Sequence, residues 1–138
     1  MPQLEDIYPD VLRDHYEQPR NCSVLDEPTA VGTASNPLCG DELSVYLKAE
    51  DEAVKRVTFQ GHLCAVATAS ASMMSEAVKE RTFDEVAAMR ESFTAMMRGR
   101  EDTSMGELDA LRSVRRYRVR VKCALLPWEA LLEACNAA

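Results

Sequence analysis

Long apolar runs are missing from this chain of 138 residues, and none approaches the roughly 20 residues that a membrane-spanning helix needs. Its first residues, Met1 to Asp6, contain neither a basic nor an apolar segment, so we expect no secretory signal peptide. Positive charge is also scarce: the net charge is −7, and an acidic protein repels nucleic-acid phosphates. The composition therefore predicts a single domain, 1–138, that binds neither membranes nor nucleic acids.

Cysteine is sparse as well. Five cysteines are an odd number and too few for a small disulfide-stabilised scaffold, so we expect a reducing, cytoplasmic setting with free or metal-bound thiols. No motif places a base histidine beside a cysteine, and the H-x-E and P-C-x-x-C motifs of zinc deaminases are absent. These absences argue against a cysteine hydrolase and against a nucleobase deaminase.

Hydrophobic periodicity predicts an α+β fold. Alternating apolar residues predict strands over 42–49 and 54–61, joined by the acidic turn Glu50–Glu52, and 29–35 supplies a third strand of a small antiparallel sheet. A capping-box pattern at Thr82 marks the start of one helix. Helical patterns cover 4–17, 64–80, 82–98, 104–111 and 124–134, and residues 115–123 read as a further extended segment.

The segment around Cys39 suits a metal ligand. Asn36-Pro37 favours an extended backbone and Gly40 permits a tight reversal, so Cys39 is predicted to lie on an exposed turn at a strand end. Asp41, two residues later, can direct its carboxylate at the same ion.

Cys64 and Cys123 provide two further thiols. Cys64 follows the strand 54–61 and Cys123 follows the extended segment 115–123, and both are predicted at helix N-termini, where the helix dipole favours a thiolate. Together with Cys39 and Asp41 they form a complete tetrahedral set of three thiolates and one carboxylate for a zinc-like ion. Cys22 and Cys135 have no plausible ligand partner nearby and are predicted to be bystanders.

Histidine and basic residues flank this set. His62, two residues before Cys64, could replace Asp41 as a ligand or hydrogen-bond to a ligand without binding the metal itself. His15 is instead predicted to be a packed or hydrogen-bonded residue. In an extended 115–123 segment, Arg120 and Lys122 lie on the opposite parity to Cys123. Either cation could offset the negative charge of a thiolate-bound metal, or dock an acidic partner.

At these residues the chain resembles the U-type iron–sulfur assembly proteins, which comprise IscU-type scaffolds and SufU-type sulfur-transfer proteins. The resemblance rests on Asp14-His15-Tyr16, Pro19-Arg20-Asn21, Asn36-Pro37-x-Cys39-Gly40-Asp41, Cys64 before Ala69 to Met74, and Val121-Lys122-Cys123-Ala124. It implies a three-stranded antiparallel sheet flanked by helices, and metal ligation by Cys39, Asp41, Cys64 and Cys123.

Two features favour the SufU branch. Scaffolds usually carry a histidine directly before the third cysteine, where this chain has Lys122, and 99–113 resembles the insertion typical of that branch. The resemblance then implies zinc, a PLP-dependent SufS-type cysteine desulfurase as partner, and a downstream Suf assembly scaffold. It also implies that a partner histidine displaces Cys39 from zinc, and that Cys39 accepts the persulfide sulfur.

Three functions are therefore expected, in this order. The first is a zinc-dependent sulfurtransferase that accepts sulfur from its desulfurase and activates it. The second is a scaffold that holds iron, or a labile iron–sulfur cluster, on the same cysteines. The third is an adaptor with a structural zinc, which the carboxylate of Asp41 disfavours because structural sites are usually built from cysteine and histidine alone.

Overall fold

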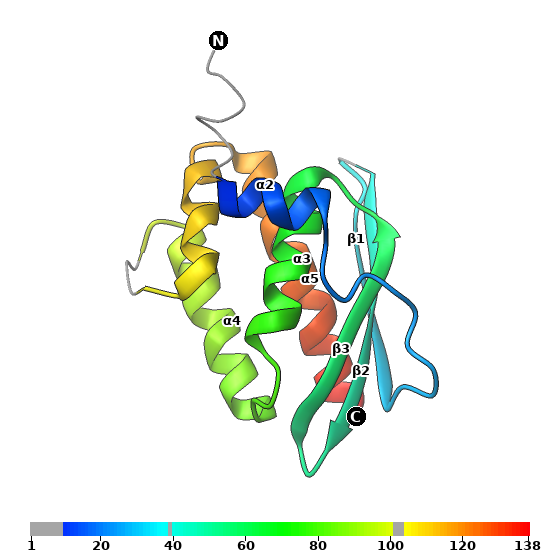
Figure 1. The fold of residues 1–138 in the computed structure, drawn as a ribbon. Coiled ribbons are helices and arrows are strands. Elements are labelled where there is room, and N and C mark those ends of the chain that lie inside the picture. Colours follow the sequence, from blue (N-terminus) through cyan, green and yellow to red (C-terminus); the bar gives the residue numbers. More distant parts are fainter. Residues whose placement is uncertain (1–9, 39, 101–103) are drawn as a thin grey trace.

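Three antiparallel strands form the sheet of this protein, which the computed structural model describes at residues 10–38, 40–100 and 104–138. The strands have the same order in the chain and across the sheet: β1 (Ala30–Asn36), β2 (Asp41–Glu50) and β3 (Ala53–His62). The three predicted strands and the α+β class are therefore confirmed (Figure 1).

Side-chain alternation along β2 decides which face of the sheet is buried. Leu43, Val45 and Leu47 lie in the core, whereas Glu42 and Lys48, on the opposite parity, are exposed. The turn to β3 has φ values of 54° and 59° at two consecutive acidic residues, positions 51 and 52. Positive φ at both turn positions matches the right-handed twist of the flanking strands, so the predicted acidic hairpin turn is also confirmed.

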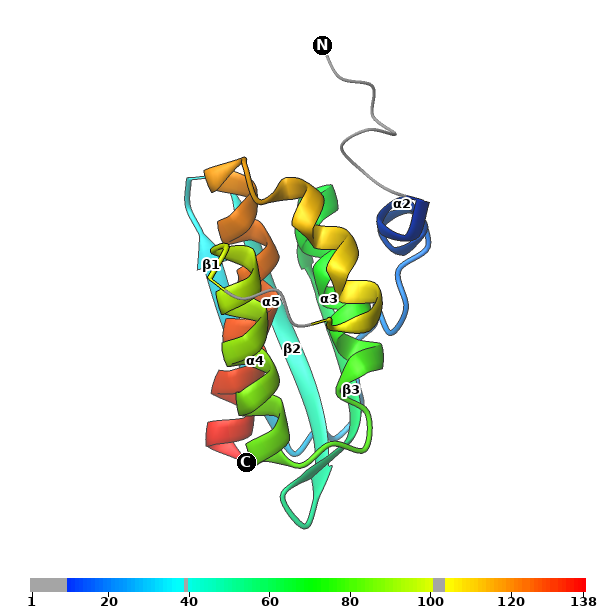
Figure 2. The ribbon, with the colours of Figure 1, turned by 90° about the vertical axis from the view of Figure 1, so that its left-hand side faces the viewer.

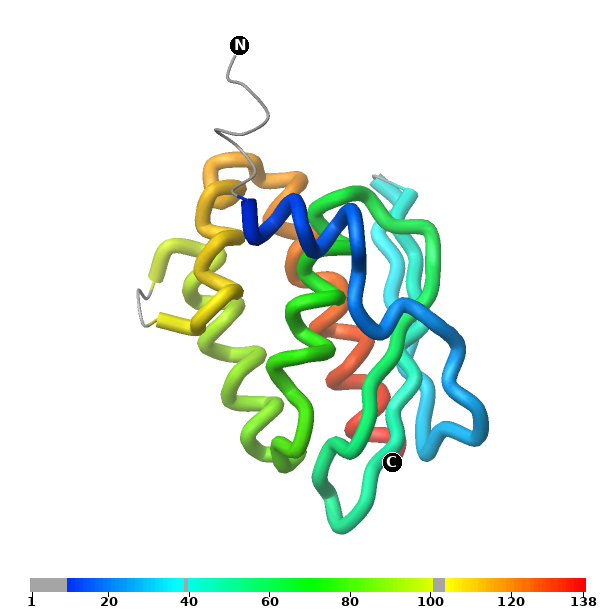
Figure 3. Tube along the Cα trace, viewed as in Figure 1, coloured from blue at the N-terminus to red at the C-terminus, as the bar shows by residue number. Residues whose placement is uncertain are grey.

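Helices cover the inner face of the sheet in two layers (Figures 1 and 2). They are α2 (Asp10–Glu17), α3 (Ala65–Ala77), α4 (Phe83–Met97), the 3₁₀ helix η1 (Gly106–Val114) and α5 (Arg118–Ala137). Helices α3 and α5 pack on the sheet and on each other, and α4 lies outside α5. Helix α2 crosses α3, so segments far apart in the chain lie side by side (Figure 3).

Helix α5 lies directly on β1 because a glycine faces it. A Cβ atom added at Gly32 would lie 1.9 Å from the carbonyl oxygen of Ala130 and 2.7 Å from the backbone nitrogen of Ala134. Only hydrogen fits in that space. This close contact fixes the position of the helix that carries Cys123.

The predicted capping box at the start of α4 is present. Thr82 Oγ1 accepts a hydrogen bond from the Glu85 backbone nitrogen at 3.1 Å, and Glu85 Oε1 accepts one from the Thr82 backbone nitrogen at 3.0 Å. The bond from the Thr82 backbone lowers the pKa of Glu85. The side-chain pattern Thr-x-x-Glu therefore specifies this helix start locally.

The prediction for 115–123 was wrong. These residues do not form an extended segment; α5 begins at Arg118, six residues before the predicted start at 124. Cys123 consequently lies in the second turn of the helix rather than at its N-terminus. Pro127, which was expected in a first turn, is inside the helix, and α5 still continues to Ala137.

The predicted insertion 99–113 contains most of η1, which overlaps the short helix predicted over 104–111 and continues to Val114. Residues 101–103 of that insertion, and residues 4–9 of the predicted first helix 4–17, lie outside the described residues. Leu108, Leu111 and Val114 of η1 are buried in the same hydrophobic core as the sheet and the helices. Among the described helices, none is both long and apolar enough to cross a membrane.

Candidate metal site

Three of the four predicted ligands meet at one end of the protein, the end drawn uppermost in Figure 1. Asp41 is the first residue of β2, Cys64 immediately precedes α3, and Cys123 belongs to α5. One oxygen of Asp41 and the two sulfur atoms all lie within 4.8 Å of one another. Cys39, the fourth predicted ligand, lies outside the described residues.

The Asp41 carboxylate is oriented by a hydrogen bond from the segment between β3 and α3. Its side chain points inward from the sheet, and the residue is only 4% exposed. Oδ1 accepts a hydrogen bond from the backbone nitrogen of Cys64 at 2.8 Å. This charge-assisted bond orients the carboxylate toward Cys64 although 23 residues separate them in the chain.

Cys64 is the N-cap residue of α3, as predicted. Its backbone is extended, with φ −68° and ψ 169°, and its Sγ accepts a hydrogen bond from the Ala67 backbone nitrogen at 3.4 Å. The sulfur therefore lies at the positive end of the α3 dipole, where it accepts from a backbone N–H that has no partner within the helix. The sulfur thus belongs to the residue just before α3, whereas the residues of α3 itself are mostly buried in the core.

Cys123 is fully buried on α5, and α3 helps to hold the backbone beside it. The Ser70 hydroxyl of α3 donates a hydrogen bond to the carbonyl oxygen of Ala124 at 2.6 Å. Four residues after Cys123, Pro127 has no N–H and cannot make the usual helical bond to the Cys123 carbonyl. A buried bond between the two cysteine-bearing helices therefore reinforces α5 where its own ladder is interrupted.

The turn between β1 and β2 has the geometry that its sequence predicts. Asn36 Oδ1 accepts a hydrogen bond from the Leu38 backbone nitrogen at 3.2 Å, which closes a turn around Pro37. Gly40 has φ +74°, a left-handed conformation that suits glycine. Leu38 is 75% exposed, so the residue on the N-terminal side of position 39 faces solvent.

The donor set fits a zinc-like ion. Thiolate sulfur and carboxylate oxygen are both common zinc ligands, and tetrahedral geometry with bonds of 2.0–2.3 Å puts ligand atoms about 3.3–3.8 Å apart. Atoms within 4.8 Å of one another need a movement of only about 1 Å to reach such spacing. Cys39 is next to Gly40 in the chain and would supply the fourth ligand. Metal binding by these four residues stays a prediction.

A family model described as the NifU-like N-terminal domain matches residues 7–124. The chain belongs to this family. It is similar to the zinc-dependent sulfurtransferase SufU of Bacillus subtilis, with 37% identity over 93% of this chain and 88% of that protein. It is also similar to the iron–sulfur cluster assembly scaffold protein IscU of Streptococcus pyogenes, with 35% identity over 96% of this chain and 84% of that protein.

Solved structures of the family have the same fold. A protein described as an iron–sulfur cluster assembly scaffold for the SUF system, from Fervidobacterium islandicum, superimposes with a TM-score of 0.89 at 30% identity, covering 96% of this chain and 99% of that one. The chain is therefore a NifU-like domain of the SufU and IscU type, from the iron–sulfur cluster assembly family.

The supporting residues of this NifU-like domain lie differently from the predicted arrangement. His62 is exposed at the end of β3 and is not part of the Asp41–Cys64–Cys123 group. Because 118–123 is helical, Arg120 and Lys122 do not share one side of a strand. Lys122 is exposed beside the end of α4, and Arg120 is half-buried and makes contacts of its own.

Cys22 and Cys135 lie apart from the group of three ligands. Cys22 is exposed in the loop before β1, and Cys135 is buried near the end of α5. Burial raises the pKa of both thiols, and that of Cys135 reaches about 11. Both thiols are therefore less ionised than an ordinary cysteine at neutral pH.

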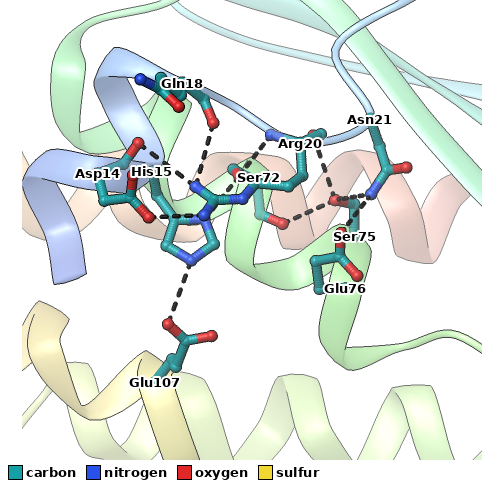
Figure 4. A network of polar contacts seen from close by, with 9 residues as sticks. All are labelled: Asp14, His15, Gln18, Arg20, Asn21, Ser72, Ser75, Glu76 and Glu107. Carbon is teal, nitrogen blue, oxygen red and sulfur yellow. Dashed lines mark hydrogen bonds and ion pairs between the residues drawn. The ribbon is translucent and has the colours of Figure 1, made fainter.

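A network of polar side chains between α2 and α3 was only partly foreseen (Figure 4). His15 is 2% exposed, with Nδ1 2.7 Å from Ser72 Oγ and Nε2 3.4 Å from Glu107 Oε2, which confirms the prediction of a packed, hydrogen-bonded histidine. Ser72 Oγ also accepts from the Arg20 backbone nitrogen at 2.9 Å. The alanine- and serine-rich pattern of α3 indicates close packing, but it does not say that its serines bind the N-terminal segment.

Proposed function

We propose that this protein is a zinc-dependent sulfurtransferase that accepts sulfur from a SufS-type cysteine desulfurase and thereby activates that enzyme. The convergence of Asp41, Cys64 and Cys123 carries the proposal, because two sulfurs and a carboxylate form a zinc site with one position left for Cys39. The similarity to the sulfurtransferase of Bacillus subtilis supports it. Zinc, when bound, would keep the thiols ionised and protect them from oxidation.

The chain's own residues divide the work of this reaction. Cys64 and Cys123 are anchored in or beside helices, and Asp41 is fixed by its bond from the Cys64 backbone. Cys39 lies between exposed Leu38 and left-handed Gly40 in the chain, and is the proposed acceptor. Its thiolate attacks the terminal sulfur of the desulfurase persulfide. A sulfur–sulfur bond forms on Cys39 as the persulfide bond of the desulfurase breaks, and the desulfurase cysteine leaves as a thiolate, so no oxidant is needed.

Lys122 favours transfer over cluster assembly. The residue before the third cysteine is a lysine, which carries no imidazole donor for iron. The proposed setting is the reducing cytoplasm, where free thiols persist and a downstream Suf assembly scaffold would take the sulfur. Cys22, Cys64, Cys123 and Cys135 form no disulfide with one another, which is compatible with that setting.

A scaffold that builds a labile iron–sulfur cluster on the same cysteines is the second candidate. The similarity to IscU scaffold proteins favours it, since several relatives with 32–38% identity carry that name. The two candidates differ in the bound metal and in what the desulfurase produces in their presence.

Metal analysis of protein purified without added metal separates the two candidates. The sulfurtransferase predicts about one zinc per chain and no visible charge-transfer bands, because zinc is a closed-shell ion. Iron with acid-labile sulfide and a brown colour would instead identify the scaffold.

A desulfurase assay tests the acceptor directly. With a SufS-type desulfurase, the chain is expected to speed sulfide release from cysteine, and Cys39→Ser is expected to abolish that increase and any transfer of radiolabelled sulfur to the chain. Cys22→Ser, in the exposed loop, is the matched control and should retain both. Normal sulfur uptake by Cys39→Ser would show that the acceptor is another residue.

A further inference from the structure

A groove of about 450 Å³ lies between the end of α4 and the beginning of α5. Figure 2 shows the beginning of α5 above the end of α4. None of the residues that line it belongs to the Asp41–Cys64–Cys123 group, so it is separate from the candidate metal site. Five of its lining residues are cationic: Arg98, Arg100, Arg115, Arg118 and Lys122.

This concentration of positive charge is unusual for the chain. The net charge is −7, yet half of the 16 lysines and arginines lie between positions 98 and 122. The structure uses one groove cation internally, because Arg115 donates to the carbonyl oxygen of Met96 at 3.2 Å. Among the described residues, the other four have no ion-pair partner.

Two of these cations occupy positions that oppose helix stability. Arg118 and Lys122 lie in the first two turns of α5, where no acidic residue is present in the first turn. The N-terminal end of a helix carries partial positive charge, so acidic residues are favourable there and basic residues are not. Local features that conflict with stability are typical of binding sites, and the dipole of α5 adds to the positive potential of the groove.

The groove also has an apolar part. Met97 and Leu125 line it with 1% and 8% exposure, and Val121, which also lines it, is partly buried. Cations around apolar side chains complement a segment that carries both carboxylates and an aliphatic residue. A small anion would use the cations and leave the apolar part uncovered.

We propose that this groove binds an acidic segment of a partner protein, with carboxylates on its cations and one aliphatic side chain on Met97, Val121 and Leu125. The residues that line this surface do not include the proposed metal ligands. The surface lies on the α4 side of α5, apart from the turn that carries the proposed acceptor Cys39.

Fluorescence anisotropy with the labelled peptide Asp-Glu-Leu-Glu-Asp tests the surface in the full chain at low salt. Arg98→Ala/Arg118→Ala is expected to weaken binding about 10-fold, and 0.5 M salt is expected to weaken it further. Lys55→Ala/Arg56→Ala removes the same charge from β3 and should change the affinity less than about 2-fold. Equal loss in both double variants would reduce the effect to net charge and overturn the proposal.

Three further measurements decide the occupant. A peptide with serine in place of leucine should bind about 5-fold more weakly, since the apolar contact is lost; unchanged affinity would overturn the role of the apolar part. Displacement of the peptide by equimolar ATP would identify a phosphate site instead.

Glu101 and Asp102 follow Arg100 in the chain. If the peptide binds to the double variant Glu101→Gln/Asp102→Asn but not to the unmodified chain, the groove binds the chain's own acidic residues, and the proposal fails.

Arg118→Glu separates binding from folding. The substitution places an acidic residue in the first turn of α5, so we expect a higher melting temperature together with at least about 10-fold weaker peptide binding. A lower melting temperature would mean that Arg118 supports the fold, and would contradict the assignment of this residue to binding.

Discussion

Helix α3 takes part in two polar clusters that differ in what completes them. Around Ser72, hydrogen-bond donors and acceptors alternate: the Arg20 backbone donates to the hydroxyl, and His15 links the hydroxyl to Glu107. At the start of the same helix, the side chains of Asp41, Cys64 and Cys123 offer only sulfur and carboxylate atoms within 4.8 Å of one another.

The difference lies in charge. A cluster with its own donors and acceptors is satisfied by folding alone, and it contributes to the stability of the protein. Three groups that bind metals as anions repel one another when they are ionised together, and a bound cation relieves that repulsion. The Ser72 cluster therefore holds the fold, and the Asp41–Cys64–Cys123 cluster is built for a ligand.

The largest effect that distinguishes the two clusters is expected for Cys123→Ser. A serine hydroxyl stays protonated at neutral pH and is a poor zinc ligand, so zinc affinity should fall by more than about 100-fold, as measured by competition with a chromophoric chelator. Cys22→Ser is the control, since Cys22 lies in an exposed loop. Zinc affinity close to that of the unmodified chain would remove Cys123 from the site.

Ser72→Ala tests the opposite cluster. It leaves the buried His15 Nδ1 and the Arg20 backbone nitrogen without their partner, so the free energy of unfolding should fall by about 2 kcal/mol in urea titrations. Zinc affinity should change less than about 3-fold. Thr68→Ala on the same helix, where Thr68 makes no described side-chain hydrogen bond, should cost clearly less. Equal losses in both variants would mean that packing, not the network, matters.

Asp41→Asn removes charge while an amide oxygen can still accept the bond from the Cys64 backbone. We expect zinc affinity to fall about 10-fold and zinc release to a chelator to accelerate, because a neutral amide is a weaker ligand. The metal-free protein should be at least as stable as before, because the substitution removes a negative charge from the cluster. Unchanged release kinetics would count against Asp41 as a ligand.

Arg20→Gln should have the smallest effect. The Arg20 guanidinium pairs with Asp14 at 2.6 Å, but this pair is exposed, and the buried bond to Ser72 comes from the Arg20 backbone, which the substitution keeps. The melting temperature should therefore be nearly unchanged at both low and high salt. A drop as large as that of Ser72→Ala would show that the surface ion pair orders the segment.

Several elements of the fold could be predicted because their signals are local. Alternation along β2 requires one face of the sheet to be buried, and the Thr82–Glu85 capping box fixes the start of α4 within four residues. Cys64 at the N-cap of α3 was predictable for the same reason, since a strand that ends in glycine and a short turn precede a helical pattern.

The start of α5 was not predictable in this way. Basic and β-branched or aromatic residues alternate over 116–121 and match a strand, yet these residues begin or precede a 20-residue helix. The reason is tertiary: the helix packs against α3, α4 and the sheet, and Gly32 lets it lie directly on β1. Local propensity is weak compared with that buried contact.

The sequence by itself determined the antiparallel sheet, the helix caps, the glycine turn after position 39 and the residue types that can bind a metal, because each depends on neighbours in the chain. Only the tertiary structure decided that Asp41, Cys64 and Cys123 come within 4.8 Å of one another, that α3 serines bind the N-terminal segment, and that cations distant in sequence line one groove. Those features depend on how elements pack, and packing is set by buried surfaces that no local pattern contains.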